Sequence, residues 1–265
     1  PNIEKLSKPT GIEVSSLTDW YRVIDWWFDK YGKYATAVKS QQAYWRDIDY
    51  SIVAKKEAEP IFKKFIDKQQ LSDGEKKKLE DHLFWYAVDK ATEFNLPVKL
   101  HTGYYAGHNS MPLARLRNNP GSATNLCKIA IKRRPKTRFV FMHTCYPYYE
   151  EMISIAKHWS NAYVDMSWIW ILNPVAAKDF LKKYLVTAPA NKIFVFGGDY
   201  TRVEPVLGHS ILARQGITLA LSELVEENWI TLKDALELID PIMHENAKKV
   251  FDLKRKTEIL KDVSW

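Results

Sequence analysis

Short apolar runs alternate along the chain with longer stretches in which apolar residues recur at helical spacing. Each run is six or seven residues long and is apolar on both faces, as a strand buried on both sides requires. Strands separated by helices pair in parallel through right-handed crossovers, so the pattern predicts an α/β protein. The five predicted strands lie at residues 34–40, 97–102, 138–143, 162–167 and 192–197.

The stretches between these strands predict helices. Ser72 and Glu75 form a Ser-x-x-Glu capping box, after which apolar residues recur three and four positions apart. Pro147 and Pro205 are each predicted to open a helix, because proline suits the first helical turn. Further helices are predicted at 126–130 and 175–185, with C-terminal helices from about residue 231. We expect the whole chain, 1–265, to form one domain.

Polar residues stand at or near the carboxyl ends of the predicted strands. Lys39 lies at the end of the first strand, His101 and His143 at the ends of the second and third, and Asp199 directly after the fifth. The fourth strand carries Asp165 within it. In a parallel barrel these ends open on one face, where enzymes of this architecture have their active sites. Two imidazoles and a carboxylate that meet there suit zinc or a similar divalent ion.

Each of these residues also has an ordinary structural interpretation. A lone histidine at a strand end is more often a hydrogen-bonded structural residue, Asp199 can cap the next helix, and Lys39 can reach solvent. A doubly wound sheet fits the rhythm of strands and helices as well as a barrel does. The occurrence of three such residues at the same end of the strands favours the barrel and the functional interpretation.

Three of these strand segments resemble the fifth, sixth and eighth strand motifs of the amidohydrolase-2 family. They are LPVKLHTG at 96–103, FMHTCYP at 141–147 and IFVFGGDY at 193–200. The segment ENAKKVF at 245–251 is similar to the C-terminal Asn-Ala helix of that family. The first predicted strand, with VKS at 38–40 and YWR at 44–46, resembles the fourth-strand segment of its nodulin/glutamine-synthetase-associated branch.

The resemblance implies a (β/α)8 TIM barrel with a divalent metal, expected to be zinc. It makes His101 a metal ligand, Asp199 both a ligand and the general base, and His143 a second ligand or a hydrogen-bonding partner of the substrate. Lys39 matches the position where some members carry a carboxylated lysine that bridges two metals, and where others carry only a strand-end residue. A bound ion lowers the pKa of its water to about 7, and the adjacent carboxylate takes the proton as that water attacks.

One part of the family pattern is missing from this chain. The first strand of the family carries a His-x-His pair that supplies two metal ligands, and the sequence has no such pair. By this comparison the first three strand–helix units are absent, and we expect the active protein to have more chain before Pro1. The alternative is that residues 1–34, with an aromatic helix that contains Trp20 and Trp27, fill the gap in a smaller fold.

The expected activity is hydrolysis of a C–N or C–O bond in a small, anionic substrate. A metal-dependent decarboxylase or a uronate-type isomerase on the same barrel is the alternative, because fold does not settle chemistry. A non-catalytic barrel remnant that binds a ligand or partner is the alternative from another class, and the missing His-x-His pair favours it. The retained His101, His143 and Asp199 favour an enzyme.

Several residues are candidates for substrate binding. Arg202 follows Asp199 by three residues and can clamp a carboxylate, although a surface salt bridge is an equal alternative. Trp168 and Trp170 can line the pocket or fill the core. His108 lies in the loop after His101, and Arg115 and Arg117, further along that loop, can read an acidic group.

The composition of the chain limits the classes of partner and the locations that are expected for the protein. The formal charge of +7 is spread along the chain and fits a solvated surface or a field that attracts an anionic small molecule, and no nucleic-acid motif is present. No stretch approaches about 20 consecutive apolar residues, so no membrane span is expected. Two cysteines without a Cys-x-x-Cys pair favour a reducing compartment such as the cytoplasm. Unpaired strand edges leave a homo-oligomer open.

Overall fold

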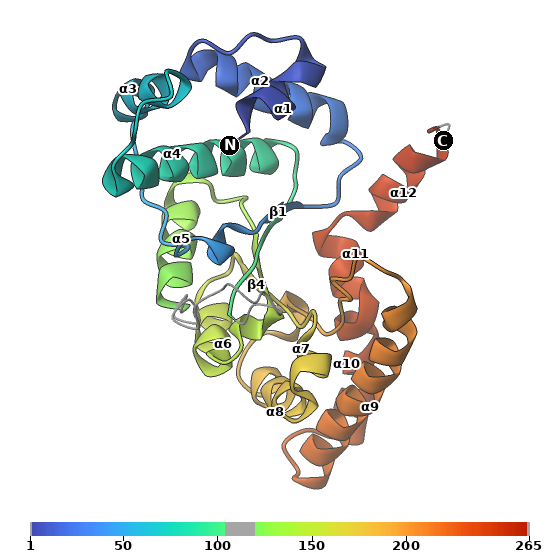
Figure 1. The fold of residues 1–265 in the computed structure, drawn as a ribbon. Coiled ribbons are helices and arrows are strands. Elements are labelled where there is room, and N and C mark those ends of the chain that lie inside the picture. The colour runs from blue at the N-terminus through green and yellow to red at the C-terminus, as the bar shows by residue number, and fades with distance from the viewer. Residues whose placement is uncertain (1, 104–119, 264–265) are drawn as a thin grey trace.

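A single sheet of five parallel strands forms the centre of the protein (Figure 1). The computed structural model describes residues 2–103 and 120–263, so His108, Arg115 and Arg117 lie outside the described residues. The strands follow one another in chain order, as they do in a barrel, whereas a doubly wound sheet reverses its order partway. The strands are β1 (Val38–Ser40), β2 (Val98–Leu100), β3 (Phe139–Met142), β4 (Ala162–Asp165) and β5 (Ile193–Phe194).

All five predicted strands are confirmed, and each lies inside its predicted range. Their side chains alternate between two apolar layers. Val98, Phe139 and Val164 belong to the main core beneath the helices. Val140 and Phe194 belong to a separate cluster that also contains Val250, Ala247 and Phe251 near the C-terminus. The inner face of the sheet is therefore closed in part by the C-terminal segment.

Helices pack against the other face of the sheet. The capping box predicted at Ser72 and Glu75 is present at the start of α4. Pro205 lies in the first turn of α9, as predicted. The helices are α1 (Ile3–Ser7), α2 (Leu17–Tyr31), α3 (Lys55–Ile66), α4 (Asp73–Glu93), α5 (Pro120–Arg133), α6 (Tyr149–His158), α7 (Ile169–Leu172), α8 (Pro174–Leu185), α9 (Glu204–Glu226), α10 (Leu232–Asp240), α11 (Asn246–Val250) and α12 (Leu253–Lys261).

The predicted start of α6 is wrong, whereas the predicted start of the C-terminal helices agrees with the structure. Pro147 does not open α6, because Tyr148 has a non-helical backbone and the helix begins at Tyr149. The C-terminal helices begin where they were predicted, since Thr231 caps α10. Among the described residues, no helix is both long enough and apolar enough to cross a membrane.

The aromatic helix near the N-terminus, α2, packs away from the strands. Its buried Leu17, Trp20 and Val23 form a cluster with side chains of α3 and α4, among them Phe62. In Figure 1 α1, α2 and α3 lie beyond α4, on the side remote from the sheet. The first part of α2 thus packs on α3 and α4, whereas Phe28 near its end packs against the main core.

Two glycines of α9 are expected to respond in opposite ways to alanine. A Cβ at Gly216 would lie 2.1 Å from the ring of the fully buried Trp170, whereas a Cβ at Gly208 meets nothing within 4 Å. Gly216→Ala is expected to lower the free energy of unfolding by about 1–3 kcal/mol through overpacking. Gly208→Ala is expected to raise it by about 0.5–1 kcal/mol, because alanine loses less backbone entropy in a helix.

Urea unfolding of the two variants beside the parent protein checks this pair. Equal stabilisation by both substitutions would mean that Trp170 does not pack against α9 as described.

Candidate active site

Four strand-end residues meet at the carboxyl edge of the sheet, as the sequence predicted for a barrel. Lys39 Nζ lies 2.6 Å from Asp199 Oδ1, and His143 Nε2 lies 3.6 Å from Asp199 Oδ2. His143 Nε2 also lies 3.2 Å from His101 Nδ1. The four side chains thus form one line of contacts. Lys39 of β1 contacts Asp199 after β5, Asp199 lies near His143 after β3, and His143 contacts His101 after β2.

His143 is the most enclosed member of this series, with 2% of its side chain exposed. Its backbone is left-handed, as are those of Thr144 and Cys145, an uncommon run for residues other than glycine. The Nδ1–H group donates to the carbonyl oxygen of Ser167 at 2.8 Å. A carbonyl only accepts, so neutral His143 carries its proton on Nδ1 and presents the Nε2 lone pair to His101 and Asp199.

The surroundings keep His143 neutral near pH 7. Burial lowers the pKa of the imidazole below its ordinary 6.5, although the Ser167 carbonyl and the charges of Asp165 and Asp199 oppose this. A neutral ring with a free lone pair is the form that accepts a hydrogen bond or binds a metal.

Asp199 is held in its ionised form. Burial raises the pKa of its carboxyl, but the hydrogen bond and charge of Lys39 outweigh this effect, with smaller contributions from His143 and Lys99. The net result is a pKa below the ordinary 3.8. The side chain remains 28% exposed, so the carboxylate is accessible from the mouth of the sheet.

Tyr44 is a neighbour of the site to which the sequence analysis gave no role. It ends a short 3-10 turn, Gln42–Tyr44, that follows β1, and its ring centroid lies 4.4 Å from that of His101. Burial raises the pKa of the Tyr44 hydroxyl, and the charge of Asp199 adds to this. Its position a few residues past the polar end of a strand was the available signal.

The donor atoms suit a divalent ion, but the arrangement does not complete a metal site. Among the described residues, no group of three or more His, Cys, Asp or Glu side chains could hold an ion. Two features of the network explain this. The His101 and His143 nitrogens face each other across a hydrogen bond, and the Lys39 ammonium lies on one Asp199 oxygen.

The three predicted substrate-binding residues that the structure describes have different positions. The Trp168 ring lies 6.3 Å from that of His143 and 6.4 Å from that of Tyr200, beside the site. Trp170 is fully buried and donates to the Val195 carbonyl, so it fills the core and does not line the pocket. Arg202 is exposed, and the structure gives it no ion pair within the described part of the chain.

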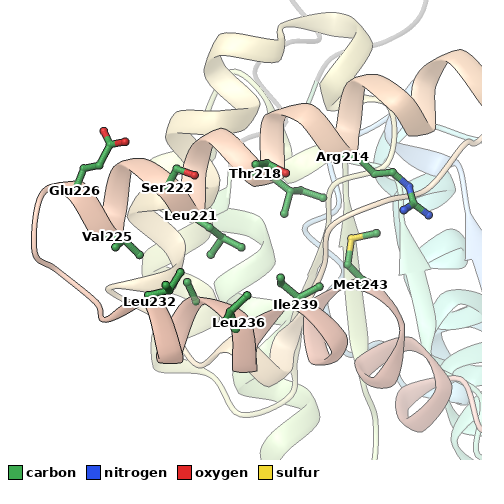
Figure 2. Close-up of a pocket in the computed structure, with 12 residues that line it drawn as sticks. Arg214, Thr218, Leu221, Ser222, Val225, Glu226, Leu232, Leu236, Ile239 and Met243 are labelled. Atoms are coloured by element: carbon green, nitrogen blue, oxygen red, sulfur yellow. The ribbon is translucent and has the colours of Figure 1, made fainter.

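One surface cavity lies away from the site, and another reaches Lys39. Figure 2 shows one of about 430 Å³ between α9 and α10, with Leu221 and Val225 facing Leu232 and Leu236. None of the candidate residues lines it. A second, of about 460 Å³, lies between β1 and α4 and includes Lys39 in its lining.

Comparisons with known proteins agree with this architecture. The chain is 24% identical to protein fluG of Emericella nidulans over 168 residues, which are 63% of this chain and 18% of fluG. Among solved structures it resembles a protein described as a metal-dependent hydrolase from Lactobacillus casei, with 21% identity and a TM-score of 0.72. That match covers 96% of this chain and 65% of the other.

Two isomerase structures are also similar. Uronate isomerase from Thermotoga maritima is 17% identical with a TM-score of 0.71, over 94% of this chain and 57% of its own. Glucuronate isomerase from Caulobacter crescentus is 18% identical with a TM-score of 0.74, over 95% and 54%. These likenesses establish the barrel fold, and the chain spans between a half and two thirds of the solved structures. The amidohydrolase family profile matches residues 68–253, well over half of the sequence, and the chain therefore belongs to the amidohydrolase family.

Proposed function

We propose that the protein is a metal-dependent hydrolase that cleaves a C–N or C–O bond of a small anionic molecule. The observation that carries the proposal is the convergence of His101, His143, Asp199 and Lys39 at the carboxyl edge of a parallel sheet. His101, His143 and Asp199 are the proposed metal ligands. When a divalent ion is bound in such a site, water that it activates becomes a nucleophile near neutral pH.

Asp199 is the proposed general base. Its Oδ1 is held by Lys39, whereas Oδ2 faces His143 at 3.6 Å and is the oxygen that we propose takes the proton. Lys39 keeps the carboxylate ionised and orients it. This ion pair favours an ammonium at Lys39 over the carboxylated, metal-bridging lysine that the family resemblance allows, because a second negative charge would repel Asp199.

The substrate would be read by residues around this edge. Arg202 follows Asp199 by three residues on the same loop and is exposed, so we propose that it binds a substrate carboxylate. Trp168 would form an apolar wall beside His143. The net charge of +7 supports an anionic substrate. We further propose zinc as the metal and the cytoplasm as the location, the latter because both cysteines are free and buried.

A uronate-type isomerase is the second candidate, because two of the similar structures are named as uronate or glucuronate isomerases. The same carboxylate would then move a proton between carbons of the substrate. A decarboxylase on this barrel is the remaining enzymatic alternative. A non-catalytic remnant is favoured by the absence of a three-ligand group among the described residues.

Metal analysis and turnover separate these candidates. The purified protein, loaded with Zn²⁺ and dialysed, is expected to retain metal and to hydrolyse a member of a panel of N-acyl amino acids and lactone carboxylates. His101→Asn and His143→Asn are expected to lose the metal, whereas His158→Asn, at an exposed position that ends α6, is expected to keep it. Turnover of uronates alone would replace the hydrolase by the isomerase, and a protein that neither retains metal nor turns over any substrate would be the remnant.

Lys39→Met is expected to raise the pKa of Asp199, because the hydrogen bond and charge that lower it are removed while burial remains. In the parent protein the folded pKa is depressed, so the stability from this carboxylate is present above pH 3.8 and is lost as pH falls through the lower folded value. In Lys39→Met the Asp199 carboxylate is expected to become protonated at a higher pH than in the parent protein. A ¹³C NMR titration of the metal-free protein measures this. Lys39→Arg keeps the charge and should keep the pKa low; an unmoved pKa in Lys39→Met would contradict the prediction.

A further inference from the structure

A second pair of charges lies on the inner face of the sheet, beside the proposed site. Lys99 is the register partner of Lys39 on the neighbouring strand, so the two side chains leave the sheet on the same face. Lys99 Nζ lies 2.7 Å from Asp165 Oδ2 of β4. The Asp165 side chain is only 4% exposed. The Lys99 side chain is 24% exposed, so the desolvation cost falls mainly on the Asp165 carboxylate, and the pair by itself is weak evidence for a role in stability.

The other oxygen of Asp165 holds Ser167. Asp165 Oδ1 accepts a hydrogen bond from the Ser167 backbone N–H at 2.8 Å and another from the Ser167 hydroxyl. Ser167 is 1% exposed, so no water competes for these donors. Because both Ser167 donors bind the same Asp165 oxygen, the orientation of the backbone at Ser167 is defined.

Ser167 is also confined from the side of β5. The Gly197 carbonyl accepts a hydrogen bond from the Trp168 N–H at 3.2 Å. A Cβ at Gly197 would lie 2.5 Å from the Ser167 hydroxyl oxygen and 3.3 Å from Asp165 Oδ1. Only glycine permits this approach of the two strand ends, and the approach leaves Ser167 little room to turn.

The carbonyl of Ser167 is the group that His143 Nδ1–H contacts at 2.8 Å. The orientation of the Ser167 carbonyl therefore determines which ring nitrogen of His143 carries the proton. It also determines the direction in which the Nε2 lone pair points. A continuous series of contacts therefore runs from Lys99 through Asp165 and Ser167 to His143.

We propose that Lys99 and Asp165 are positioning residues that act through Ser167 to hold His143 as the Nδ1–H tautomer, with Nε2 turned to Asp199. The inference rests on the proposed function only for the role of His143 as a metal ligand. The simpler reading, that the ion pair merely joins β2 to β4, makes a different prediction. A purely structural role predicts lower stability with an unchanged His143 tautomer, whereas a positioning role also changes the tautomer, so the two are separated by a measurement on His143 itself.

The test is the double variant Lys99→Met, Asp165→Leu, which removes both charges and the one carboxylate oxygen that accepts both hydrogen bonds from Ser167. Imidazole ¹⁵N shifts of His143 are recorded at pH 7.5 in metal-free protein, and the signal is assigned by its loss in His143→Asn. The parent protein is expected to show protonated Nδ1 and unprotonated Nε2. The double variant is expected to lower its urea midpoint, because the buried Ser167 donors lose their acceptor, and to lose the separation of the two ¹⁵N shifts as the tautomers mix.

Ser167→Ala provides a milder variant should the double variant not fold. It removes one of the two bonds to Asp165 and leaves the ion pair, and it is expected to move the His143 shifts in the same direction by a smaller amount. Unchanged His143 shifts in whichever variant folds would overturn the proposal.

Lys192→Met is the control for a general effect of losing a lysine that is bonded within the sheet region. Lys192 lies just before β5, at the opposite edge of the sheet, where its ammonium donates to the carbonyls of Ala156 and Trp159. Its loss is expected to lower the urea midpoint and to leave the His143 shifts unchanged; shifts that move equally in this control would also overturn the proposal. Because no substrate or metal is needed, failure of this test is distinct from failure of the proposed hydrolase activity, which the parent protein alone reveals.

Discussion

Asp199→Asn is expected to lower kcat/KM by about 10²–10⁴-fold on any substrate that the protein turns over, the contribution typical of a positioned general base. The amide cannot take a proton, and it leaves the Lys39 ammonium, 2.6 Å away in the parent protein, without its counter-ion. The loss should appear in kcat, since the proton moves in the transition state and not on binding.

Asp179→Asn is the matched control for this change. Asp179 lies on α8 with 46% of its side chain exposed, and its contact with Lys178 is a surface pair of little energetic value. We expect parent kcat/KM in this control and parent circular dichroism spectra in both variants. An Asp199→Asn protein that retained parent kcat/KM would remove Asp199 from the reaction.

Asp81→Ala is expected to lower the free energy of unfolding by about 3–5 kcal/mol, the cost of breaking a buried charge network from one side. Asp81, on α4, is 2% exposed and accepts from Arg46, from Lys77 and from the backbone N–H of Ser51. Its loss would leave Arg46, whose side chain is only 12% exposed, facing a cavity. The Arg46 pKa is raised, because Asp81 outweighs the opposing effect of burial.

Glu80→Ala on the same helix is the matched control. Glu80 also contacts Arg46, at 3.1 Å, but it is 27% exposed, and its removal should change the free energy of unfolding by less than about 1 kcal/mol. Urea unfolding measures both variants. Equal, small losses would show that the segment from Arg46 to Ser51, which follows Tyr44 of the site, is held by other contacts.

The five strands were predictable because each is a short, mainly apolar run rich in β-branched and aromatic residues, and the runs alternate with longer segments of helical period. The lengths of the strands could not be predicted as well from the sequence. The predicted run at 192–197 contains a strand of only two residues, Ile193–Phe194, because a strand extends only as far as its neighbour offers ladder partners. That limit belongs to the assembled sheet and not to the run itself.

The two tryptophans after β4 show where local sequence was insufficient. Trp168 and Trp170 follow the strand by three and five residues and have the same chemistry, and both were candidates for the pocket wall. Trp168 takes a left-handed backbone before α7, which turns its ring toward His143. Residues two apart on a helix point in nearly opposite directions, so Trp170 enters the core against Gly216.

The sequence by itself determined which residues stand at the carboxyl ends of the strands, since strand positions follow from local periodicity and parallel pairing brings those ends together. Only the tertiary structure decided which of them are partners. Lys39 and Asp199 are 160 positions apart, and no local pattern distinguishes that pairing from Lys39 with Asp165. The choice depends on how the strands are arranged around the inner face, where the Lys99 side chain contacts Asp165 and the Lys39 side chain contacts Asp199.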